Sequence, residues 1–461
     1  MVFSSAIFLY FFLPLFLAAY YVSPKSLKSL VIALGSYVFY GWWRPDFVFL
    51  MLFSTVLDYF CGQAIASRQE QGGKGKRWLW VSMVANLGLL GYFKYANFGV
   101  ETANAILGHF GFETMSWTKI VLPVGISFYT FQTMSYTIDV YRRAARPVSR
   151  FRDFMCYVAL FPQLVAGPIV RYNSIAEQLR DRRHTFAKFF QGVLLFQIGF
   201  SKKLLIADVM GNFADQAFAG HQLSTLDSWA GILAYAFQIY FDFSGYSDMA
   251  IGLGLMLGFR FPVNFDGPYR SASITEFWRR WHISLSSWLR DYLYIPLGGN
   301  RKGPIRTYVN LALTMLLGGL WHGASWTFIA WGGYQGFWLI VERLMGKDSF
   351  YRRAPRLIRI TLTFILVLFG WVFFRSPDIH SALHYFAMMF GQVRVGPPLD
   401  IRPIHLVALV VGAVVIWFLP TSQRLAARAA PFVSLGLQPI FLVAILHLHY
   451  QSHVPFLYYQ F

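Results

Sequence analysis

The sequence has few charged residues. Only 13% of its 461 residues are Asp, Glu, Lys or Arg, against roughly 25% in soluble globular proteins. Hydrophobic residues make up 56% of the chain and aromatic residues 19%. This balance excludes an ordinary soluble fold, and it also excludes intrinsic disorder, which requires low hydrophobicity. We therefore expect a polytopic membrane protein.

Acidic residues are scarcer than basic ones. The chain has 21 Asp and Glu against 40 Lys and Arg, a formal net charge of +19. In a soluble domain this excess would suggest nucleic-acid binding. In a chain of apolar runs, basic cytoplasmic loops beside anionic lipid explain it, and we expect no nucleic-acid partner. A share of the arginines can also bind an anionic donor.

Cysteine is nearly absent. The two cysteines, Cys61 and Cys156, lie in apolar contexts, which excludes a disulfide framework and a Cys-type zinc site. No P-loop, Gly-x-Ser-x-Gly elbow or His-Glu-x-x-His motif is present. We expect no metal and no bound cofactor. The stretch 1–22 lacks the basic start of a cleaved signal peptide, so we expect it to be a retained first span.

Apolar stretches of suitable length recur along the whole chain. A transmembrane helix needs about 20 apolar residues. The candidate spans are 2–22, 27–43, 46–65, 78–97, 120–138, 186–210, 229–258, 308–321, 324–342, 357–374, 404–419 and 432–449. They predict an all-α fold with about 11–12 transmembrane helices.

Loop charge indicates the orientation of these spans. Basic loops alternate with loops that hold little Lys or Arg, which predicts cytoplasmic basic loops and a periplasmic N-terminus. The basic loops are 23–29, 66–77, 139–153 and 259–307, and the others include 98–119 and 211–228. The stretch 450–461 has no Lys or Arg, so the C-terminus is also expected to be periplasmic.

The apolar segment 154–170 has basic residues on both sides and contains Pro162, Gly167 and Pro168. This pattern favours a re-entrant hairpin that enters the membrane and returns to the same face. One full span is the alternative.

A histidine lies in the middle of the apolar run 308–342. Its first arm, 308–321, would rise only about 21 Å as a helix, against a hydrocarbon core of about 30 Å. We therefore expect the turn that carries His322 to lie below the outer surface. A neutral imidazole there can take a proton from a hydroxyl, as O-acyl transfer requires. Gly319 and Gly323 leave room for close helix packing or for substrate. A structural role for a lone membrane histidine is the alternative.

Two further segments place polar groups among apolar ones. In 277–298, apolar residues recur at helical spacing around arginines and His282, which predicts an interfacial amphipathic helix or a helix that lines a donor entrance. In 240–258, Asp242 and Asp248 lie within an apolar run. We expect them to pair with arginines or backbone groups inside the bundle, in a structural or a catalytic role.

Several short motifs resemble one family. Leu-Trp-His-Gly-Ala at 320–324 and Trp-Arg-Arg-Trp-His-Ile-Ser-Leu at 278–285 resemble the membrane-bound O-acyltransferase (MBOAT) family. Other stretches resemble its alginate O-acetyltransferase, AlgI-like branch: Met-Val-Phe-Ser-Ser at 1–5, Gly-Tyr-Phe-Lys-Tyr-Ala-Asn-Phe at 91–98, Phe-Asp-Phe-Ser-Gly-Tyr-Ser-Asp-Met-Ala-Ile-Gly at 241–252 and Phe-Leu-Tyr-Tyr-Gln-Phe at 456–461. The resemblance implies one membrane domain over 1–461, and it is most specific over about 240–345.

The resemblance also implies a site. In this family, tilted helices, with re-entrant and interfacial ones among them, surround a central tunnel. His322 matches the family's invariant histidine and is expected to be the general base or acyl-transfer residue, with His282 assisting it. Residues expected to bind the donor or line the tunnel are Arg279, Arg280, Trp281, Arg290, Asp291, Asp242, Asp248 and Trp321. The loop charges place His282 and the arginines on the cytoplasmic side, opposite His322.

The branch implies an acetyl relay across the bacterial inner membrane. Acetyl from a cytoplasmic donor, acetyl-CoA, would pass to a periplasmic acetyltransferase-type partner that acetylates an exopolysaccharide of biofilms, alginate or cellulose. Ser325, where many alginate relatives have asparagine, leaves the polymer open. The alternatives are a D-alanyl or other acyl transferase of the same family, and a transporter of polymer or lipid.

Overall fold

The computed structural model describes residues 1–220, 222–346, 349–392, 396–428 and 431–450. These residues form helices and loops and no β-strand, which confirms the all-α prediction. They form two compact units, Met1–Phe190 with Leu253–Phe261, and Gln191–Gly252 with Pro262–Phe461. The single membrane domain stays a prediction. The expected outer C-terminal stretch and the motif at 456–461 lie outside the described residues.

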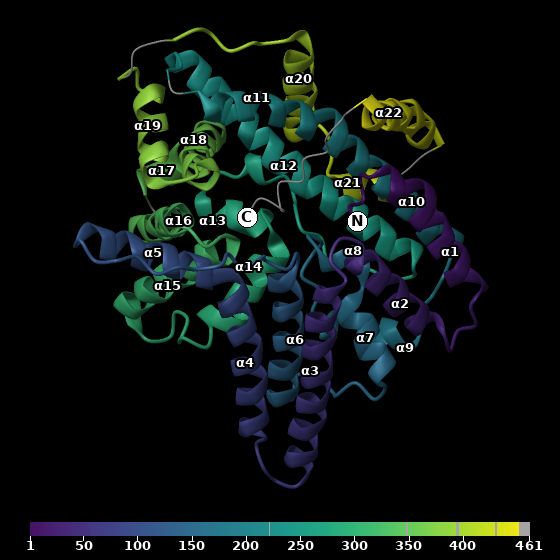
Figure 1. Cartoon of the computed structure of the whole chain (residues 1–461). Helices are drawn as coiled ribbons and strands as arrows, with labels where there is room; N and C mark the ends of the chain where they lie inside the picture. Colours follow the sequence, from purple (N-terminus) through teal and green to yellow (C-terminus); the bar gives the residue numbers. More distant parts are fainter. Residues whose placement is uncertain (221, 347–348, 393–395, 429–430, 451–461) are drawn as a thin grey trace. The chain divides into compact units, whose positions relative to one another are not determined.

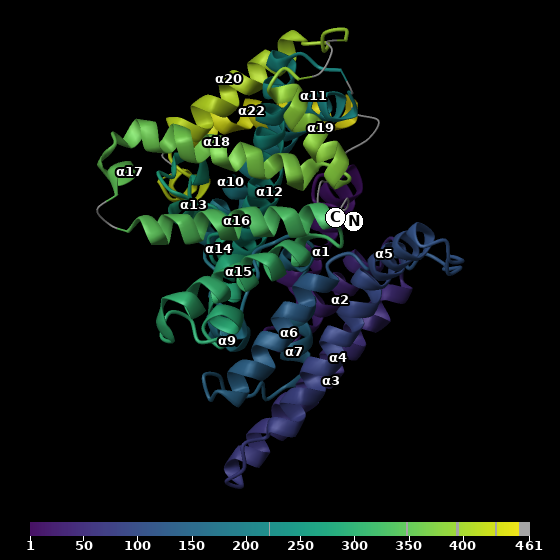
Figure 2. The same cartoon turned by 90° about the vertical axis from the view of Figure 1, so that its left-hand side faces the viewer.

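The first unit contains the N-terminal helices. They are η1 (Phe8–Phe12), α1 (Leu13–Val22), α2 (Lys28–Gly41), α3 (Asp46–Glu70), α4 (Lys76–Leu90), η2 (Gly91–Tyr95), α5 (Ala96–His109), α6 (Ile126–Tyr141), α7 (Phe151–Ala159), α8 (Phe161–Leu164), α9 (Tyr172–Arg180) and the start of α10 (Phe186–Lys202). Helices α3 and α4 run antiparallel, with α6 packed beside both (Figures 1 and 2).

Helix α3 has an inverted distribution of polarity. Phe49 and Phe60 are 71% and 62% exposed. The opposite face buries a polar cluster, in which the Ser54 hydroxyl donates to Oδ1 of Asn86 at 2.6 Å. The Asn86 amide donates to Asp58 at 2.8 Å. Water would favour the reverse arrangement, whereas apolar side chains facing outward and polar groups joining helices are typical of a bundle in lipid.

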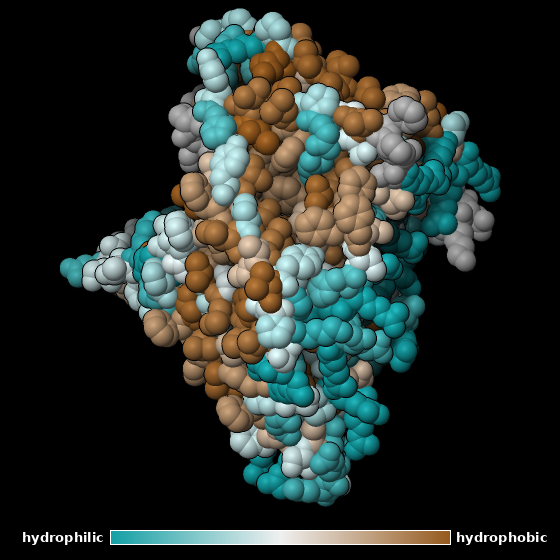
Figure 3. Space-filling view, turned by 90° about the vertical axis from the view of Figure 1, so that its right-hand side faces the viewer, coloured by the Kyte–Doolittle hydropathy of each residue, from teal (hydrophilic) through white to brown (hydrophobic). Residues whose placement is uncertain are grey.

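Apolar side chains are exposed over wide areas of the face in Figure 3. Among the described residues, two helices are long and apolar enough to cross a membrane, Asp46–Glu70 and Arg356–Arg375. Shorter apolar helices are Phe8–Val22, Pro403–Trp417 and Ser434–Tyr450. Each of the twelve predicted spans overlaps at least one helix, but most of these helices are shorter or less apolar than a membrane-crossing helix. The number of spans therefore stays a prediction.

Two segments differ from a simple series of long helices. Helix α5 (Ala96–His109) covers the first part of 98–119, where a loop was expected. In 154–170, the chain leaves the helical conformation at Leu160, with φ −46° and ψ 98°, between α7 and α8. Pro162 cannot donate a backbone hydrogen bond and crowds the preceding turn. The segment is therefore not one continuous helix, whereas the choice between re-entry and one full span stays a prediction.

The second unit holds the remaining helices. They are η3 (Lys203–Ala207), α11 (Asp208–Ala219), α12 (Thr225–Met256), η4 (Pro268–Arg270), α13 (Ile274–Arg280), α14 (Ile283–Leu289), η5 (Arg290–Tyr294), α15 (Gly303–His322), α16 (Trp326–Met345), α17 (Phe350–Arg353), α18 (Arg356–Arg375), α19 (Ile379–Met389), α20 (Pro403–Trp417), α21 (Ser422–Ala427) and α22 (Pro431–Tyr450). Helices α15, α16 and α18 pack side by side (Figure 2).

Helix α15 is longer than the sequence suggested. It begins at Gly303, where φ is +83°, and a proline occupies its first turn. Pro at this position is a helix-start signal, but the polar residues around it favoured a loop. With 20 residues the helix is about 30 Å long. The short-arm argument for the depth of His322 is therefore wrong.

Candidate active site

His322 is the last residue of α15, and the following turn joins α15 tightly to α16. A Cβ atom on Gly319 would overlap the carbonyl oxygen of Phe328 on α16, and one on Gly323 would overlap the ring of Phe328. Only glycine therefore fits at both positions. This confirms the expected role of these glycines in close packing.

His282 lies where a helix breaks. The helical spacing of 277–298 predicted one amphipathic helix, but α13 ends at Arg280 and α14 starts at Ile283. Between them His282 has φ 42° and ψ 54°, in the left-handed region, which is uncommon for a residue other than glycine. The His282 side chain is fully buried. The interpretation as one continuous interfacial helix is wrong, and the break turns His282 into the interior of this unit.

Asn264 holds the His282 ring. Its Oδ1 accepts the backbone N–H of Ser284 at 3.2 Å and the Ser284 hydroxyl at 2.8 Å. Nδ1 of His282 lies 3.2 Å from the same oxygen. Because a backbone N–H can only donate, this atom must be the amide oxygen, and Nδ1 of His282 must therefore carry the proton that it donates. On its other side, the Asn264 amide donates to the Ser247 hydroxyl on α12 at 3.1 Å.

The other nitrogen of His282 has no such partner. Burial lowers the pKa of His282, which lies between the predicted spans, far below its value in water. The ring is therefore neutral, and its proton lies on Nδ1. Nε2 is buried and has no hydrogen-bond partner among the described residues. It is thus a buried lone pair that can accept a hydrogen bond from a substrate.

The two histidines lie side by side. Their ring centroids are 6.3 Å apart, although 322 and 282 belong to different elements. The sequence placed them on opposite sides of the membrane, and that placement is wrong, because the break at His282 brings its ring beside the end of α15. Aromatic rings surround the pair at 4.7–5.9 Å between centroids, namely Trp321, Trp331, Phe374 and Phe243. This wall supports the placement of Trp321 at the site.

The predicted donor arginines have partners of their own. Arg280 pairs with Glu276 at 2.8 Å, and Arg290 pairs with the predicted site residue Asp291 at 2.6 Å. Arg279 is exposed. Trp281 is buried, with its ring 4.9 Å from that of Trp371. The donor-binding role of these residues stays a prediction.

Asp242 and Asp248 are buried in ion pairs, as expected, but their charged partners are lysines instead of arginines. Lys203 Nζ lies 3.0 Å from Asp242 and also pairs with Asp208. Lys202 Nζ lies 2.8 Å from Asp248, whose other oxygen accepts a hydrogen bond from Gln423. These contacts favour a structural role for the aspartates.

Sequence reasoning missed two groups of residues. Lys202 and Lys203 fall inside the predicted span 186–210. Charged groups within a span are costly and usually paired. This rule singled out Asp242 in 240–258, and it would also have found the two lysines. Asn264 had no such signal, because it lies 18 positions before His282 in a segment that is not periodic. Only the folded chain brings it to the ring.

Comparison with known proteins gives consistent results. The family model "MBOAT, membrane-bound O-acyltransferase family" matches residues 141–376, a range that contains both histidines and Asn264. The chain is 46% identical to a "Probable alginate O-acetylase AlgI" of Pseudomonas putida, with 100% of both chains covered. It is 53% identical to a protein of the same name from Azotobacter vinelandii, over 85% of this chain and 78% of the relative. It is 37% identical to a "Peptidoglycan O-acetyltransferase" of Helicobacter pylori, over 85% and 80%.

Proposed function

Because this chain belongs to the membrane-bound O-acyltransferase family, and is accordingly an O-acyltransferase, we propose that it transfers acetyl groups for O-acetylation of an exopolysaccharide of the alginate type. The similar relatives are named for O-acetylation of two different polymers, alginate and peptidoglycan. Both names specify transfer of an acetyl group, but they differ in the polymer that receives it. Cellulose is the other acceptor that the sequence suggested.

The observation that carries this proposal is the buried histidine pair. His282 and His322 come from different elements, their rings are 6.3 Å apart, and both lie in the range matched by the family. Acyl transfer to a hydroxyl needs a base that removes the proton and a surrounding that excludes water. The histidine pair is suited to the first task, with Nε2 of His282 able to accept a hydrogen bond from the acceptor, and the aromatic wall around both rings is suited to the second.

We assign the roles as follows. The acceptor oxygen attacks the carbonyl carbon of the acetyl thioester, the bond from that carbon to sulfur breaks, and the hydroxyl proton is transferred to the leaving thiolate. In this direct route His322 takes the proton from the hydroxyl and passes it to the thiolate, and His282 assists by accepting a hydrogen bond at Nε2. In the alternative route a ring nitrogen of His322 attacks the thioester carbon and the thiolate leaves. The acceptor oxygen then takes the acetyl group from that nitrogen, and its proton goes to the thiolate. Trp281, Trp321, Asp242, Asp248, Asp291 and the arginines at 279, 280 and 290 are proposed to line the donor route or to support it.

The route is proposed to cross the membrane. Acetyl-CoA supplies the acetyl group from the cytoplasm, and a tunnel among about 11–12 spanning helices leads past the histidines. A periplasmic acetyltransferase-type partner then modifies the polymer. The exposed phenylalanines of α3 support a location in the bacterial inner membrane. The basic loops support a cytoplasmic donor side.

The first test is His322→Ala in cells that make the polymer. Removal of a general base slows transfer by about 10²–10⁴-fold, so we expect acetate released from the purified polymer to fall to background. The membrane level of the variant must equal that of the wild type. His380→Ala, an exposed histidine on α19, is the matched control and should leave acetylation unchanged.

Three results would contradict the proposal in whole or in part. A His322→Ala protein at normal level with full polymer acetylation would remove the catalytic assignment. Unchanged acetylation with loss of exported polymer would instead favour a transporter. Transfer of D-alanine in place of acetate would show a different acyl group with the same site.

A further inference from the structure

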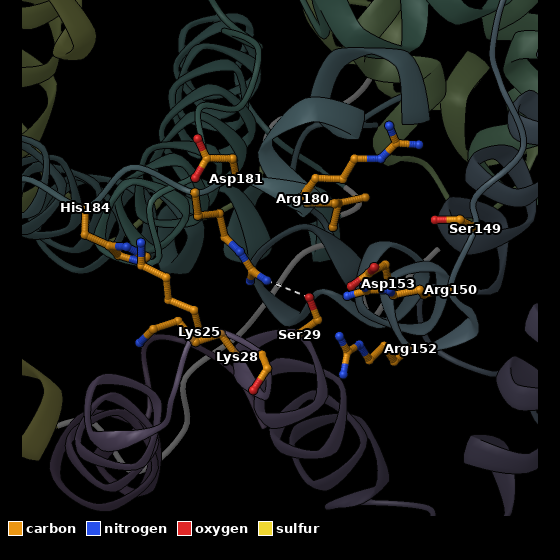
Figure 4. Close-up of a pocket in the computed structure, with 13 residues that line it drawn as sticks. Lys25, Lys28, Ser29, Ser149, Arg150, Arg152, Asp153, Arg180, Asp181 and His184 are labelled. Atoms are coloured by element: carbon orange, nitrogen blue, oxygen red, sulfur yellow. Dashed lines mark hydrogen bonds between the residues drawn. The ribbon is translucent and has the colours of Figure 1, made fainter.

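A pocket lined by cations lies in the unit Met1–Phe190 with Leu253–Phe261, separate from the histidine pair. Its volume is about 570 Å³, within the roughly 300–1,000 Å³ of small-molecule sites. Its walls come from three basic stretches, 25–29, 149–153 and 179–184, which include the ends of α2, α7 and α9. The basic residues on both sides of the expected re-entrant hairpin assigned the last two to the same side of the membrane, and the charge of 23–29 assigned the first to that side as well. Figure 4 shows Lys25 and Lys28 on one side of the pocket, Arg150 and Arg152 on the other, and Arg180 between them.

Positive charge prevails in this pocket. Its lining has six cationic side chains, Lys25, Lys28, Arg150, Arg152, Arg180 and Arg182. Two carboxylates, Asp153 and Asp181, share the lining. Among the ion pairs found in the described part of the chain, none joins these carboxylates to the six cations. Like charges held close together repel, so the arrangement is suited to an anion that enters from outside.

Arg152 and Arg182 each have a buried hydrogen-bond donor that is not paired within the described residues. Nη2 of Arg182 donates to the Ser29 hydroxyl at 2.6 Å, and its guanidinium lies 5.1 Å from the ring of Phe259. These contacts fix the side chain against the wall. Nη1 of Arg182 and Nε of Arg152 are nevertheless buried without a hydrogen-bond partner among the described residues. A buried donor left unpaired is costly, and the oxygens of a bound anion would satisfy both.

The cations of the pocket lower the pKa of a neighbouring histidine, His184. Burial and the positive charges of Lys28 and Arg182 lower the pKa of His184, in the loop before α10. Its ring is neutral at pH 7, so the positive charge of the pocket comes from lysine and arginine alone.

We propose that this pocket binds the phosphate groups of an organic phosphate. Arginine forks match phosphate oxygens with paired hydrogen bonds, and lysines add compact positive charge. Two cellular sources present this chemistry at a cytoplasmic membrane face, the phosphorylated nucleotide end of coenzyme A and the headgroup of an anionic phospholipid. General attraction to lipid needs only basic residues scattered near the surface, whereas here three stretches of the chain form a concave site. The proposal does not depend on the chemistry at His322.

The test compares two double variants of the full-length protein. Lys25→Gln with Arg180→Gln removes two exposed cations of the pocket and leaves the buried contacts of Arg182 in place. Lys74→Gln with Lys76→Gln, the turn variant, removes the same charge from the turn between α3 and α4 and from the first residue of α4, outside the pocket lining. Two probes are used. Coenzyme A is titrated into detergent-purified protein, and protein purified with phosphatidylglycerol is examined by native mass spectrometry for retained lipid.

We expect one probe to bind the wild type and to bind the pocket variant about ten-fold more weakly or not at all, since charge-assisted hydrogen bonds are lost. The turn variant should match the wild type. Loss of coenzyme A affinity identifies the nucleotide as the source, and loss of retained phosphatidylglycerol identifies the lipid. If the wild type binds neither probe, or if both double variants reduce binding equally, the pocket is not a phosphate site.

Discussion

The left-handed backbone of His282 is stabilised by contacts, because its residue type does not favour it. A non-glycine residue in this region costs about 1–3 kcal/mol. Asn264 Oδ1 accepts three hydrogen bonds, from the backbone and hydroxyl of Ser284 and from Nδ1 of His282. Each contributes about 0.5–1.5 kcal/mol net, so together they offset the backbone cost. Asn264 is therefore a positioning residue for the histidine ring.

Asn264→Ala should separate positioning from chemistry. The substitution removes the acceptor that fixes both the backbone turn and the protonated nitrogen of His282. We expect acetyl transfer to slow by about 100-fold, the effect of a displacement of about 1 Å at a reacting group. The folded fraction, measured by size-exclusion chromatography, should remain sufficient for the assay.

Asn264→Asp provides the readout that a merely structural role would not affect. A carboxylate still accepts from Nδ1 and from Ser284, so this variant should be more active than the alanine variant. Its charge favours the protonated ring and raises the pKa of His282. The rate should therefore fall on acidification at a higher pH than in the wild type. An unchanged pH profile, or an alanine variant at the wild-type rate, would refute the positioning role.

Among the elements, the pair α15 and α16 depends most visibly on residue size. A methyl group on Gly319 would meet a backbone oxygen, which cannot move aside as a flexible side chain can. At Gly333 the nearest atom to an added Cβ is the side-chain Cδ2 of Leu316, at 3.6 Å, an ordinary contact. The two glycines thus form a matched pair on facing helices.

Gly319→Ala should destabilise the protein and reduce acetylation together. Overpacking typically costs about 1–3 kcal/mol, and here it also pushes apart the helices that hold His322. Gly333→Ala should be close to neutral. Thermal unfolding of the purified proteins, with polymer acetylation in cells, checks both. Equal melting temperatures for the two variants would show that the close approach of α15 and α16 is unimportant.

The sequence predicted where helices lie better than it predicted where they begin or are interrupted. Apolar runs located the helices because burial and lipid both select such residues over 15 or more positions. The break at His282 escaped prediction because the bonds that stabilise it come from Asn264, outside the periodic segment. The start of α15 escaped because its first turn is polar. Local pattern thus identified His322 and His282, whereas their proximity and the tautomer of His282 depend on contacts distant in sequence.

In the molecule as a whole, the basic loops provide a test of orientation. Ser26 and Ser149 lie exposed in loops assigned to the cytoplasm, and Glu113 is exposed in a loop assigned to the periplasm. Ser174 is exposed on α9, after the expected re-entrant hairpin and therefore also on the cytoplasmic side. The natural cysteines, Cys61 and Cys156, are buried, so the wild type should give little background with a membrane-impermeant maleimide.

Single cysteines at these four positions should divide into two classes. Glu113→Cys should react in intact spheroplasts, and the three serine replacements should react only after permeabilisation, because positive loops remain on the cytoplasmic side. Gel shift of the labelled protein measures both. Since Ser26 and Ser149 line one pocket, their cysteines must behave alike. Labelling of those two from opposite sides would contradict the structure of the first unit as well as the orientation.

The fixed tautomer of His282 has a regiochemical consequence. Because the hydrogen stays on Nδ1 and is donated to Oδ1 of Asn264, an electrophile that modifies this ring must form its bond at Nε2. Only Nε2 of this imidazole can therefore act as a nucleophile. Peptide mapping after treatment with an acylating or alkylating reagent would identify a single positional isomer at residue 282, in contrast to the mixture given by a histidine whose two tautomers interconvert.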